Sequence, residues 1–507
     1  MMAASELNVM NLAELLSGIE VIGEVPVIGI QGMALDSRRL GQGDLFIACA
    51  GYQSHGLEYI DDAIANGAEV VLAEVCSNWL PEQIAALSEE KNIVIVPVGA
   101  LTEAVSLIAG RFYGNPSQQF PLIGITGTNG KTSSSLFVAQ AFTGTKKVAV
   151  MGTIGNGFPG DLKPSTHTTM DPVSVQATLA DLYQRQADMV VMEVSSHALH
   201  QGRVADVQFD IAVLTNFSRD HLDYHGTMAD YAEAKSLLFR MNGLKSSVIN
   251  ADDDLGQRLI AEMQKSPARV VAYGTADIDT DKVDEWIRAD NIRMLPYGIE
   301  FELFSGWGQA SVNLGLIGRF NVQNAMVALA VMLECGMDFN QAVDNLQKLE
   351  NVPGRMELIT KAQGPSVVVD FAHTPDALDQ VLRSLKAHVE GKLFCVFGCG
   401  GDRDKGKRPQ MGKVAESLAD VVVLTSDNPR SENPDDIIED IKRGLESADK
   451  AIVEPSRAHA IQLAINSAGE GDVVLLAGKG HEAFQVVGDL KLPFSDQEQV
   501  RSALEAL

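Results

Sequence analysis

The sequence predicts an α/β protein built from about three domains. A chain of 507 residues is too long for one hydrophobic core, because single domains usually hold about 100–200 residues. Short β-branched runs alternate with helical stretches from residue 121 onward, which is typical of a mainly parallel sheet. Stretches rich in Gly, Asn and Pro at 111–121 and 351–355 interrupt this alternation. We therefore expect domains at residues 1–112, 113–350 and 351–507.

The charge balance limits the classes of partner. The chain carries 67 acidic and 40 basic residues, a net charge of -27, so it repels nucleic acid and anionic membranes. Five scattered cysteines fit reduced thiols. The N-terminus has no basic segment followed by an apolar one, and no run approaches the roughly 18 apolar residues of a membrane span. We expect a soluble cytoplasmic monomer that binds no nucleic acid and does not insert into membranes.

The predicted strands end in loops suited to ligand binding. The runs "GDLFIA", "AEVVLAE" and "NIVIVPV", with the helical stretch "YIDDAIANGA", predict a small first domain. In the middle and last domains, "PLIGIT", "ADMVVMEV", "KLFCVFG", "ADVVVLTSD" and "GDVVLLAG" each run into a polar, glycine-rich or charged loop. Ligands of open α/β sheets bind beyond the carboxyl ends of the strands. The chemistry is therefore expected at facing strand ends of these two domains.

The strongest local signal is "GITGTNGKTSSS". A strand leads into a glycine-rich turn whose backbone N–H groups can cradle phosphates, Lys131 can reach the β and γ oxygens, and the Thr132 hydroxyl can join a magnesium shell. The strict P-loop pattern wants glycine at position 125, where this chain has Ile125. The alternative is an ordinary turn with a surface lysine.

Acidic and histidine side chains follow two further strands. Glu193 ends "ADMVVMEV", where a carboxylate could coordinate magnesium opposite the phosphate loop. The stretch "RDHLDYHG" adds His221 and His225, whose spacing suggests a metal, although a capping or core role for one of them fits equally well. Lys235 lies on an amphipathic helix and is either an exposed lysine or a desolvated amine that reacts with carbon dioxide to give a carbamate.

Arg430 stands in "LTSDNPRSENPDD", where every other charge is negative. Such a lone cation is either a binding point for an anion or the partner of Glu432 or Asp435 in the same loop.

Two further loops of the last domain have similar signals. "GCGGDRDKGKR" resembles a phosphate loop but lacks the Gly-Lys-Ser/Thr ending, so we interpret it as an anion-binding loop with Arg403 as the contact. "LAGKGHE" combines the flexible backbone of Gly478 with Glu482, which could accept a hydrogen bond from an ammonium group.

Nine motifs together resemble the Mur ligases of bacterial peptidoglycan synthesis, in the same order and across the whole chain. They are "TGTNGKT", "EVSSHAL", "NFSRDHLDYHG", "NVQNAMVALA", "PGRME", "DFAHTPDAL", "GCGGDRDKGKRP", "SDNPR" and "GKGHE". The resemblance implies a three-domain architecture: an N-terminal domain for a uridine nucleotide sugar, a central P-loop ATPase domain, and a C-terminal Rossmann-like domain that brings an amino acid.

The resemblance also implies an activity. Within the family the motifs are most similar to a ligase that uses ATP and Mg²⁺ to add meso-diaminopimelate to UDP-N-acetylmuramoyl-L-alanyl-D-glutamate through an acyl phosphate. The nearest alternative is a relative that adds L-lysine. A folate-type polyglutamate ligase is more distant, because "SDNPR" has no reason to occur there. A nucleotide switch with a P-loop but no acyl transfer is the alternative from another class.

The family's functional residues carry over onto matching positions. The resemblance implies catalytic roles for Lys131, Glu193, His221 and a carbamylated Lys235 (N6-carboxylysine), and metal ligation by Thr132, Glu193, His221 and Lys235. It implies ATP contacts at Gly127, Thr128, Asn129, Gly130, Lys131, Thr132, Ser133, Asn324, Arg355 and Asp370. It implies contacts to the nucleotide sugar and its dipeptide at Leu35, Ser37, Tyr52, Gln53, Ser54, His167, Thr168, Thr169, Ser195, Gln201 and Arg203. It implies diaminopimelate contacts at Arg403, Asp427, Asn428, Pro429, Arg430, Gly478 and Glu482.

Two positions depart from the family pattern. His167 stands where asparagine is expected before the threonine pair, which puts one substrate contact in doubt. Phe371 replaces the usual tyrosine and removes a hydroxyl, while Asp370 and His373 beside it are kept.

Overall fold

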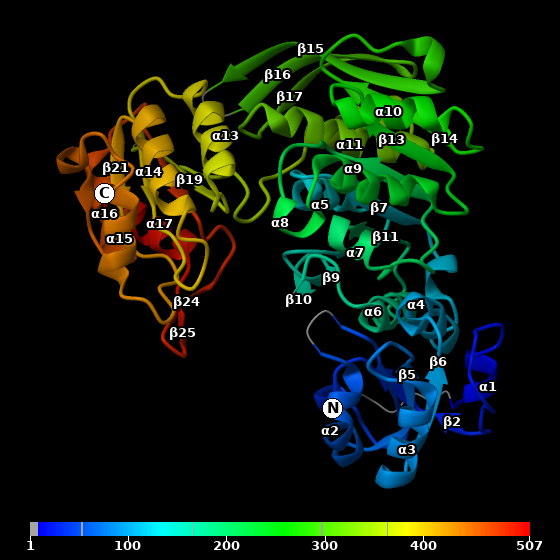
Figure 1. The fold of residues 1–507 in the computed structure, drawn as a ribbon. Coiled ribbons are helices and arrows are strands. Elements are labelled where there is room, and N and C mark those ends of the chain that lie inside the picture. Colours follow the sequence, from blue (N-terminus) through cyan, green and yellow to red (C-terminus); the bar gives the residue numbers. More distant parts are fainter. Residues whose placement is uncertain (1–8, 52–53, 166, 296–297, 362–363) are drawn as a thin grey trace. The chain divides into compact units, whose positions relative to one another are not determined.

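The computed structural model describes residues 9–51, 54–165, 167–295, 298–361 and 364–507 (Figure 1). The predicted contacts Tyr52 and Gln53 lie outside these ranges. Strands and helices alternate, so the predicted α/β class is confirmed. The chain divides into two compact units, which are described separately: residues 1–135, 142–249 and 253–270 form the first, and residues 136–141, 250–252 and 271–507 form the second.

The N-terminal part of the first unit is a small parallel sheet with strand order β3-β4-β5-β6. Its buried residues, such as Phe46, Val71 and Val96, come from the three runs that the sequence predicted as strands. The elements are β1 (Met10–Asn11), α1 (Leu12–Leu15), β2 (Gly29–Ile30), β3 (Gly32–Ala34), η1 (Ser37–Arg39), β4 (Asp44–Ala48), η2 (Gly56–Tyr59), α2 (Ile60–Ala65), β5 (Ala68–Glu74), α3 (Pro81–Lys91), β6 (Val94–Val98), α4 (Leu101–Phe112) and η3 (Pro116–Gln118).

The first unit also contains seven strands of an eleven-stranded sheet, in the order β10-β9-β8-β11-β7-β12-β13. Strands β8, β11, β7, β12 and β13 pair in parallel in that order. Strands β9 and β10 add an antiparallel edge beside β8. The elements are β7 (Leu122–Thr126), α5 (Lys131–Ala141), β8 (Val148–Met151), β9 (Asn156–Phe158), β10 (Asp161–Lys163), α6 (Pro172–Gln184), β11 (Met189–Glu193), α7 (Ser196–His200), β12 (Ile211–Leu214), α8 (Leu222–His225), α9 (Met228–Ser236), η4 (Leu237–Arg240), β13 (Ser246–Asn250) and α10 (Asp254–Met263). Parallel pairing brings the carboxyl ends of β7, β11 and β12 to one edge.

The second unit contains antiparallel strands that the sequence did not predict. Strands β15, β16 and β17 pair antiparallel, although a mainly parallel sheet was expected through this region. Their side chains alternate between buried and more exposed positions, the pattern of strands covered on one face, instead of forming apolar runs. The elements here are β14 (Arg269–Gly274), η5 (Thr280–Lys282), β15 (Glu285–Leu295), β16 (Gly298–Ser305), β17 (Gly308–Leu314), α11 (Phe320–Glu334) and α12 (Phe339–Leu346).

The C-terminal sheet is covered by helices on both faces (Figure 1). Its order is β18-β19-β23-β20-β21-β22, parallel except for the edge strand β18. Helices α13, α14 and α15 share one core with Val368 and Cys395, and α16 and α17 share another with Val367 and Phe394. Because neighbouring residues of one strand face opposite cores, these strands are apolar throughout, as in other doubly covered parallel sheets.

The elements of this C-terminal part are β18 (Glu357–Ile359), β19 (Ser366–Asp370), α13 (Pro375–Lys386), β20 (Leu393–Phe397), α14 (Lys407–Leu418), β21 (Val421–Leu424), α15 (Pro434–Lys442), η6 (Ala448–Lys450), β22 (Ile452–Val453), α16 (Arg457–Ser467), β23 (Val473–Ala477), β24 (Phe484–Val487), β25 (Leu490–Pro493) and α17 (Asp496–Ala506). Among all the helices that the structure describes, none is long and apolar enough to cross a membrane.

A buried ion pair joins the starts of α16 and α17. Arg457 Nε and Nη2 donate to the two carboxylate oxygens of Asp496 at 2.7 and 2.6 Å, and Nη2 also donates to the carbonyl of Ala477 at 3.2 Å. Both side chains are completely buried. The pair therefore ties two helix starts to the carboxyl end of β23, where the chain enters its loop.

We predict that Asp496→Ala lowers the unfolding temperature of the second unit, measured by scanning calorimetry of the full chain. Removing one partner leaves Arg457 buried and unpaired, which typically costs about 3–5 kcal/mol. The control is Asp279→Ala, which breaks an exposed pair with Lys282 and should leave the transition unchanged. Equal transitions for both variants would show that the buried pair does not hold the fold.

Candidate active site

The predicted phosphate loop joins β7 to α5. Gly127 has φ 146°, and a Cβ atom there would lie 1.8 Å from Thr215 Oγ1, so only glycine fits this approach to the end of β12. The Thr215 hydroxyl donates to the carbonyl of Asn129 at 2.6 Å and so holds the loop from outside. Ile125, the departure from the strict P-loop pattern, is a buried residue of β7 and precedes the loop itself. The predicted strand, loop and helix are confirmed.

Glu193, at the end of β11, lies beside the first turn of α5. Its Oε2 accepts from the hydroxyls of Thr132 at 3.0 Å and Thr153 at 3.1 Å, and its Oε1 accepts from the backbone N–H of Thr153 at 2.9 Å. Glu193 is 2% exposed. Parallel pairing of β11 with β7 places Glu193 opposite Ile125, which explains how Glu193 meets Thr132, 61 positions earlier in the chain. The site therefore combines a buried carboxylate with two hydroxyls.

Two lysines converge on one carbonyl oxygen of the phosphate loop. Lys131 Nζ donates to Gly127 O at 2.8 Å, and Lys235 Nζ donates to the same oxygen at 2.7 Å. Lys235 is 1% exposed and lies 4.6 Å above the ring of Tyr231, one turn earlier on α9. Burial, reinforced by the charge of Lys131, holds the pKa of Lys235 well below its usual range. Desolvation therefore disfavours the protonated form of Lys235.

His221 belongs to a group of packed rings around the start of α8. Its ring lies 4.9 Å from that of His197 and 6.0 Å from that of Tyr231, which also contacts Lys235. Burial lowers the pKa of His221, and burial with the nearby histidines lowers that of His197 to about 4. His225 bonds Ser196 Oγ at 3.0 Å and packs on Tyr231, which is the core role that sequence analysis left open for it. These imidazoles are neutral near pH 7.

Within the described ranges, no group of three or more His, Cys, Asp or Glu side chains could hold a metal ion. The predicted metal ligands are Thr132, Glu193, His221 and Lys235, and only Glu193 and His221 are side chains of these four types. The role of this set as a metal site therefore stays a prediction.

The residues predicted to contact the dipeptide form a connected group after β11. Thr169 Oγ1 donates to Glu193 O at 2.8 Å and accepts from the N–H of Ser195 at 3.0 Å. Arg203 donates to the carbonyl of Thr169 at 2.8 Å and to Gln201 Oε1. Other predicted contacts lie close by, with Thr168 Oγ1 3.1 Å from Thr153 Oγ1, and His167 exposed. The geometry places this group directly beside Glu193.

The N-terminal stretch "LDSRR" reaches the beginning of α6. Arg39 Nη1 donates to Ser174 Oγ at 3.1 Å and lies 3.9 Å from the carboxylate of Asp171. Ser37 is buried, Leu35 is half-buried, and the Asp36 side chain accepts from the backbone N–H of Arg38 in this turn. The predicted nucleotide-sugar contacts Leu35 and Ser37 thus lie on a turn that is linked to the segment following the threonine pair. Ser54 is half-buried, with Oγ 3.5 Å from Tyr59 OH.

The remaining predicted ATP contacts belong to the second unit. Asp370, at the end of β19, accepts from the N–H groups of Met356 and Ala372, both at 2.8 Å, and burial raises its pKa despite the charge of Arg355. The guanidinium of Arg355 lies 4.9 Å from the ring of Phe371. Asn324 is buried on α11 and donates to Asn321. Whether these residues meet the phosphate loop stays a prediction, because the loop lies in the first unit.

Three loops of the C-terminal sheet meet at one edge, as their parallel strands require. Asn428, after β21, is the link: its Nδ2 donates to Glu482 Oε2 at 2.8 Å, and its backbone carbonyl accepts from the N–H of Gly401 at 2.9 Å. Its Oδ1 accepts from Lys479 Nζ at 3.1 Å and from the N–H of Val486 at 3.0 Å. The clustering expected of these loops from sequence is confirmed for this domain.

Arg430 donates through Nη1 to the carbonyl of Gly401 at 2.7 Å, and its backbone has φ 51°. In the described part of the chain, no carboxylate forms an ion pair with Arg430. The alternative partner Glu432 instead binds Arg408 through both oxygens, at 2.8 and 3.0 Å, and also Lys405. These cations hold the pKa of Glu432 at about 2. The pairing of Arg430 with Glu432 that sequence analysis kept as an alternative is therefore wrong.

Arg430 has a second cation near it. A Cβ atom on Gly400 would lie 2.9 Å from Arg430 Nη1 and 3.6 Å from Arg403 Cγ, so the two predicted anion contacts flank this glycine. Arg403 is exposed. Pro429 precedes Arg430, and its carbonyl lies against Gly401. The guanidinium of Arg430 and the aliphatic stem of Arg403 thus both lie next to Gly400.

Asp427 is a buried carboxylate at the same edge. It is 8% exposed, and a Cβ atom on Gly478 would lie 2.7 Å from its Oδ2. Burial raises the pKa of Asp427, while the charges of Arg457 and Lys479 oppose this rise. Of the described side chains and N–H groups, none donates a hydrogen bond to the carboxylate of Asp427. The loop therefore holds an acid that can still accept donors.

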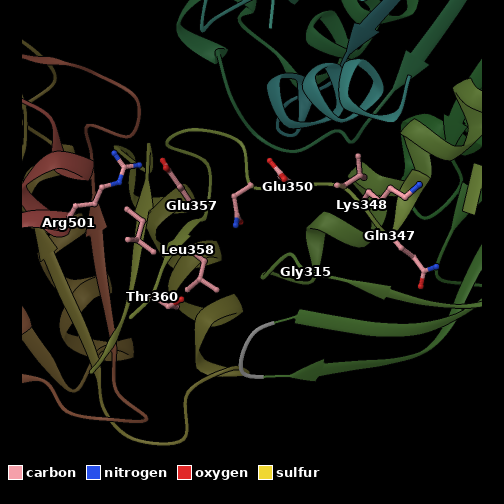
Figure 2. A pocket seen from close by; sticks show the side chains of 11 residues that line it. Gly315, Gln347, Lys348, Glu350, Glu357, Leu358, Thr360 and Arg501 are labelled. Atoms are coloured by element: carbon pink, nitrogen blue, oxygen red, sulfur yellow. The ribbon is translucent and has the colours of Figure 1, made fainter. Parts of the chain in front are cut away.

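A separate pocket of about 690 Å³ lies elsewhere in the second unit (Figure 2). Its lining includes Gln347, Lys348, Glu350, Glu357 and Arg501. It contains no residue that the sequence predicted for catalysis or ligand binding, so it is not part of the candidate active site.

Sequence analysis missed several residues that hold the site together. Thr153 lies just beyond the carboxyl end of strand β8, and Glu193 was chosen because it lies at the carboxyl end of its own strand. Tyr231 precedes Lys235 by four residues on helix α9, so both side chains lie on one helix face. These signals were present in the sequence. Lys479 and Arg408 gave no comparable signal, because only folding shows that they are buried among carboxylates.

The comparisons with known proteins cover each part of the chain. Residues 29–113 match the catalytic domain of the Mur ligase family, residues 125–332 match the Mur ligase middle domain, and residues 354–480 match the Mur ligase glutamate ligase domain.

Full-length relatives carry one name. A UDP-N-acetylmuramoyl-L-alanyl-D-glutamate--2,6-diaminopimelate ligase of Pseudomonas aeruginosa is 47% identical over 479 residues, 94% of this chain and 95% of its own. The protein of the same name from Vibrio vulnificus is 44% identical over 98% of this chain and 99% of its own.

Solved structures are similar over their whole length. One, described as a UDP-N-acetylmuramoyl-L-alanyl-D-glutamate--2,6-diaminopimelate ligase, has a TM-score of 0.69 and 36% identity over 98% of this chain and 99% of its own. MurF from Acinetobacter baumannii shares the fold, with a TM-score of 0.62 at 18% identity, over 99% of this chain and 100% of its own. The chain has the three-domain α/β architecture predicted from its motifs, and it belongs to the Mur ligase family.

Proposed function

We propose that this protein is an ATP-dependent ligase that joins meso-diaminopimelate to UDP-N-acetylmuramoyl-L-alanyl-D-glutamate in peptidoglycan precursor synthesis. The observation that carries the proposal is the loop after β21, where Arg430 and Arg403 flank Gly400 while Asp427 and Glu482 lie on the same edge. An amino acid with two ammonium groups and two carboxylates needs cations and anions side by side. The names of the full-length relatives support the same assignment.

The reaction follows from the chemistry of its substrates. A carboxylate cannot exchange an oxygen for an amine directly, because oxide is a poor leaving group. The γ-carboxylate of D-glutamate therefore attacks the γ-phosphorus of ATP and expels ADP, giving an acyl phosphate. The free amine of diaminopimelate attacks the acyl carbon, phosphate leaves with the bonding electrons, and the new amide nitrogen loses a proton. Orientation of both substrates supplies much of the rate.

Residues of the first unit suit the phosphoryl step. The N–H groups of the loop at the start of α5 and the ammonium of Lys131 would stabilise the phosphate oxygens. In this role Lys131 exchanges its bonds to the carbonyls of Gly127 and Thr128 for bonds to phosphate. We assign the remaining contacts to ATP at Asn324, Arg355 and Asp370 on the family resemblance alone.

The donor set suits magnesium. The Thr132 hydroxyl and the Glu193 carboxylate are hard oxygen donors 3.0 Å apart, of the kind that Mg²⁺ prefers, and His221 has a neutral ring nitrogen to offer. When bound with ATP, the ion would neutralise charge that develops on the transferring phosphoryl group.

Lys235 is suited to carbamylation. Carbon dioxide reacts with a neutral amine, and burial beside Lys131 favours that form of Lys235. The product is an anion that would lie next to the ammonium of Lys131, since both nitrogens now bond the carbonyl of Gly127. We therefore propose a carbamate at Lys235 that orients Lys131 and adds an oxygen donor to the magnesium site.

The second unit supplies amino-acid recognition. Arg430 would bind the distal carboxylate of diaminopimelate through parallel N–H···O bonds, with Arg403 nearby. The buried cluster around Asp427 holds three carboxylates, Asp427, Glu482 and Asp496, against two cations, Arg457 and Lys479, and so carries a net charge of -1 when all are ionised. An ammonium group at Asp427 would neutralise the cluster. L-lysine lacks the distal carboxylate and would leave Arg430 without its anion.

The direct test is an assay of product formation with purified protein, ATP, magnesium and UDP-N-acetylmuramoyl-L-alanyl-D-glutamate. Meso-diaminopimelate and L-lysine are supplied separately, and the specificity constants are compared. We expect diaminopimelate to be preferred by at least about a hundredfold, because L-lysine would exclude water from Arg430 without supplying the charge-assisted bonds, whose loss costs about 2–5 kcal/mol. A preference for lysine would refute the substrate assignment, and nucleotide hydrolysis that ignores both amino acids would refute ligase activity.

The carbamate is tested by removing its lysine. Lys235→Ala should lose at least about 99% of the turnover, because the buried anion next to Lys131 disappears. Short carboxylic acids at millimolar concentrations should restore part of the activity by placing a free carboxylate in the vacated space. Lys245→Ala, which removes an exposed lysine paired with Asp210, is the matched control. Full activity of Lys235→Ala without any added acid would exclude the proposed role.

Arg430 is tested by kinetics with both amino acids. Arg430→Ala should lower kcat/KM for diaminopimelate about thirtyfold or more, since losing charge-assisted bonds at a desolvated site costs about 2–5 kcal/mol. Arg430→Lys should recover little, because an ammonium cannot form the bidentate pair. Arg383→Ala, which removes an exposed guanidinium paired with Asp379, serves as the control. Unchanged diaminopimelate kinetics in Arg430→Ala would show that another cation binds the carboxylate.

A further inference from the structure

The segment that follows Gly478 braces the loop Asp427–Arg430. Gln485 Nε2 donates to the carbonyl of Asp427 at 2.8 Å. The N–H of Arg430 donates to Val486 O at 3.0 Å, and the N–H of Gly488 donates back to Arg430 O at 2.8 Å. These bonds hold Arg430 in its left-handed conformation, which a residue with a side chain rarely adopts without support. The recognition loop is therefore held by the start of the β24–β25 hairpin.

Among the described residues, Lys479 supplies the ammonium group that lies between the loop Asp427–Arg430 and the segment that follows Gly478. It is 0% exposed, and its Nζ donates to Asn428 Oδ1 at 3.1 Å and to Glu482 Oε2 at 3.0 Å. A fully buried lysine is costly unless it is paired and hydrogen-bonded. Both of its bonds go to predicted ligand contacts, so its burial serves to hold these two side chains.

Lys479 supplies one of the two donors that set which way the Asn428 amide faces. Its oxygen accepts from both Lys479 Nζ and the N–H of Val486, which leaves the NH₂ group to donate to Glu482 Oε2. Without the ammonium, the amide keeps one donor to its oxygen, and Glu482 loses its cation. Glu482 Oε2 is occupied twice, while no described group donates to Oε1. The lysine thus fixes the donors and acceptors that the edge of the sheet can offer.

We propose that Lys479 is a positioning residue for the amino-acid substrate. It orients Asn428 and Glu482, and by offsetting the charge of Glu482 it leaves Asp427 as the uncompensated carboxylate that receives the substrate's ammonium group. This inference rests on the proposed function of the loop. Lys479 itself touches no reacting atom, so its effect is on binding of the amino acid and not on the phosphoryl step.

The test is steady-state kinetics of Lys479→Met in the full chain, because methionine keeps an unbranched apolar side chain and loses the ammonium. We expect KM for the amino acid to rise about tenfold or more, since a hydrogen bond to a charged group contributes about 1.5–3 kcal/mol. We expect kcat at saturating amino acid, and KM for ATP and for the nucleotide dipeptide, to stay within about threefold of wild type, the scatter allowed for indirect effects.

The matched control is Lys491→Met, on strand β25 of the hairpin that follows Lys479. Lys491 is exposed, with its Nζ 3.6 Å from the centroid of the Phe484 ring, and the described hydrogen bonds and ion pairs of Asn428 and Glu482 do not include it. It should behave as wild type. A crystal structure of Lys479→Met should also show the Asn428 amide or the Glu482 carboxylate reoriented.

Two results would overturn the proposal. A purely structural role would lower kcat in proportion to the folded fraction and leave KM for the amino acid unchanged. Equal rises in KM for all three substrates would contradict a local role. Failure of the proposed function looks different: wild type would then prefer L-lysine, and the same KM comparison made with lysine would still decide what Lys479 does.

Discussion

Parallel strand pairing is the constraint on which both candidate sites depend. Because β7, β11 and β12 run in one direction, the phosphate loop, Glu193 and Thr215 emerge at a single edge. The same holds for β20, β21 and β23, which bring Gly400, Asn428 and Glu482 together. Residues separated by tens of positions become hydrogen-bonded neighbours without any long loop having to fold back.

Buried charge is the second feature common to both units. In a chain with a net charge of -27, the cations that could attract anionic substrates are held in place by specific partners. Lys131 and Arg430 are each half-buried: Lys131 donates to the carbonyls of Gly127 and Thr128, and Arg430 donates to the carbonyl of Gly401. Fixed partners reduce the reorganisation that binding would otherwise require, which is how preorganised sites gain their strength.

The two units divide the proposed reaction between them. The first holds the hydroxyls, carboxylate and lysines suited to phosphoryl transfer, and the second holds a guanidinium group and carboxylates at one sheet edge, which suit an amino acid. Each part is assembled locally, by hydrogen bonds inside its own sheet edge. The proposed acyl-transfer step requires the carboxyl carbon and the amine to meet, so its rate depends on how both substrates are oriented.

The sequence alone determined the α/β class, the strands of the parallel sheets, the phosphate loop and the family, because apolar runs ending in glycine-rich or charged loops are local patterns. It did not reveal the antiparallel strands β15–β17, whose half-buried alternation is a weaker signal. Only the tertiary structure decided that Glu432 pairs with Arg408, while Arg430 donates to the carbonyl of Gly401. It also decided that Lys235 is buried beside Lys131. The same holds for Lys479, which donates to both Asn428 and Glu482. The physical reason is that burial and charge pairing depend on side chains far apart in the chain, and no local pattern records which of them will share a desolvated space.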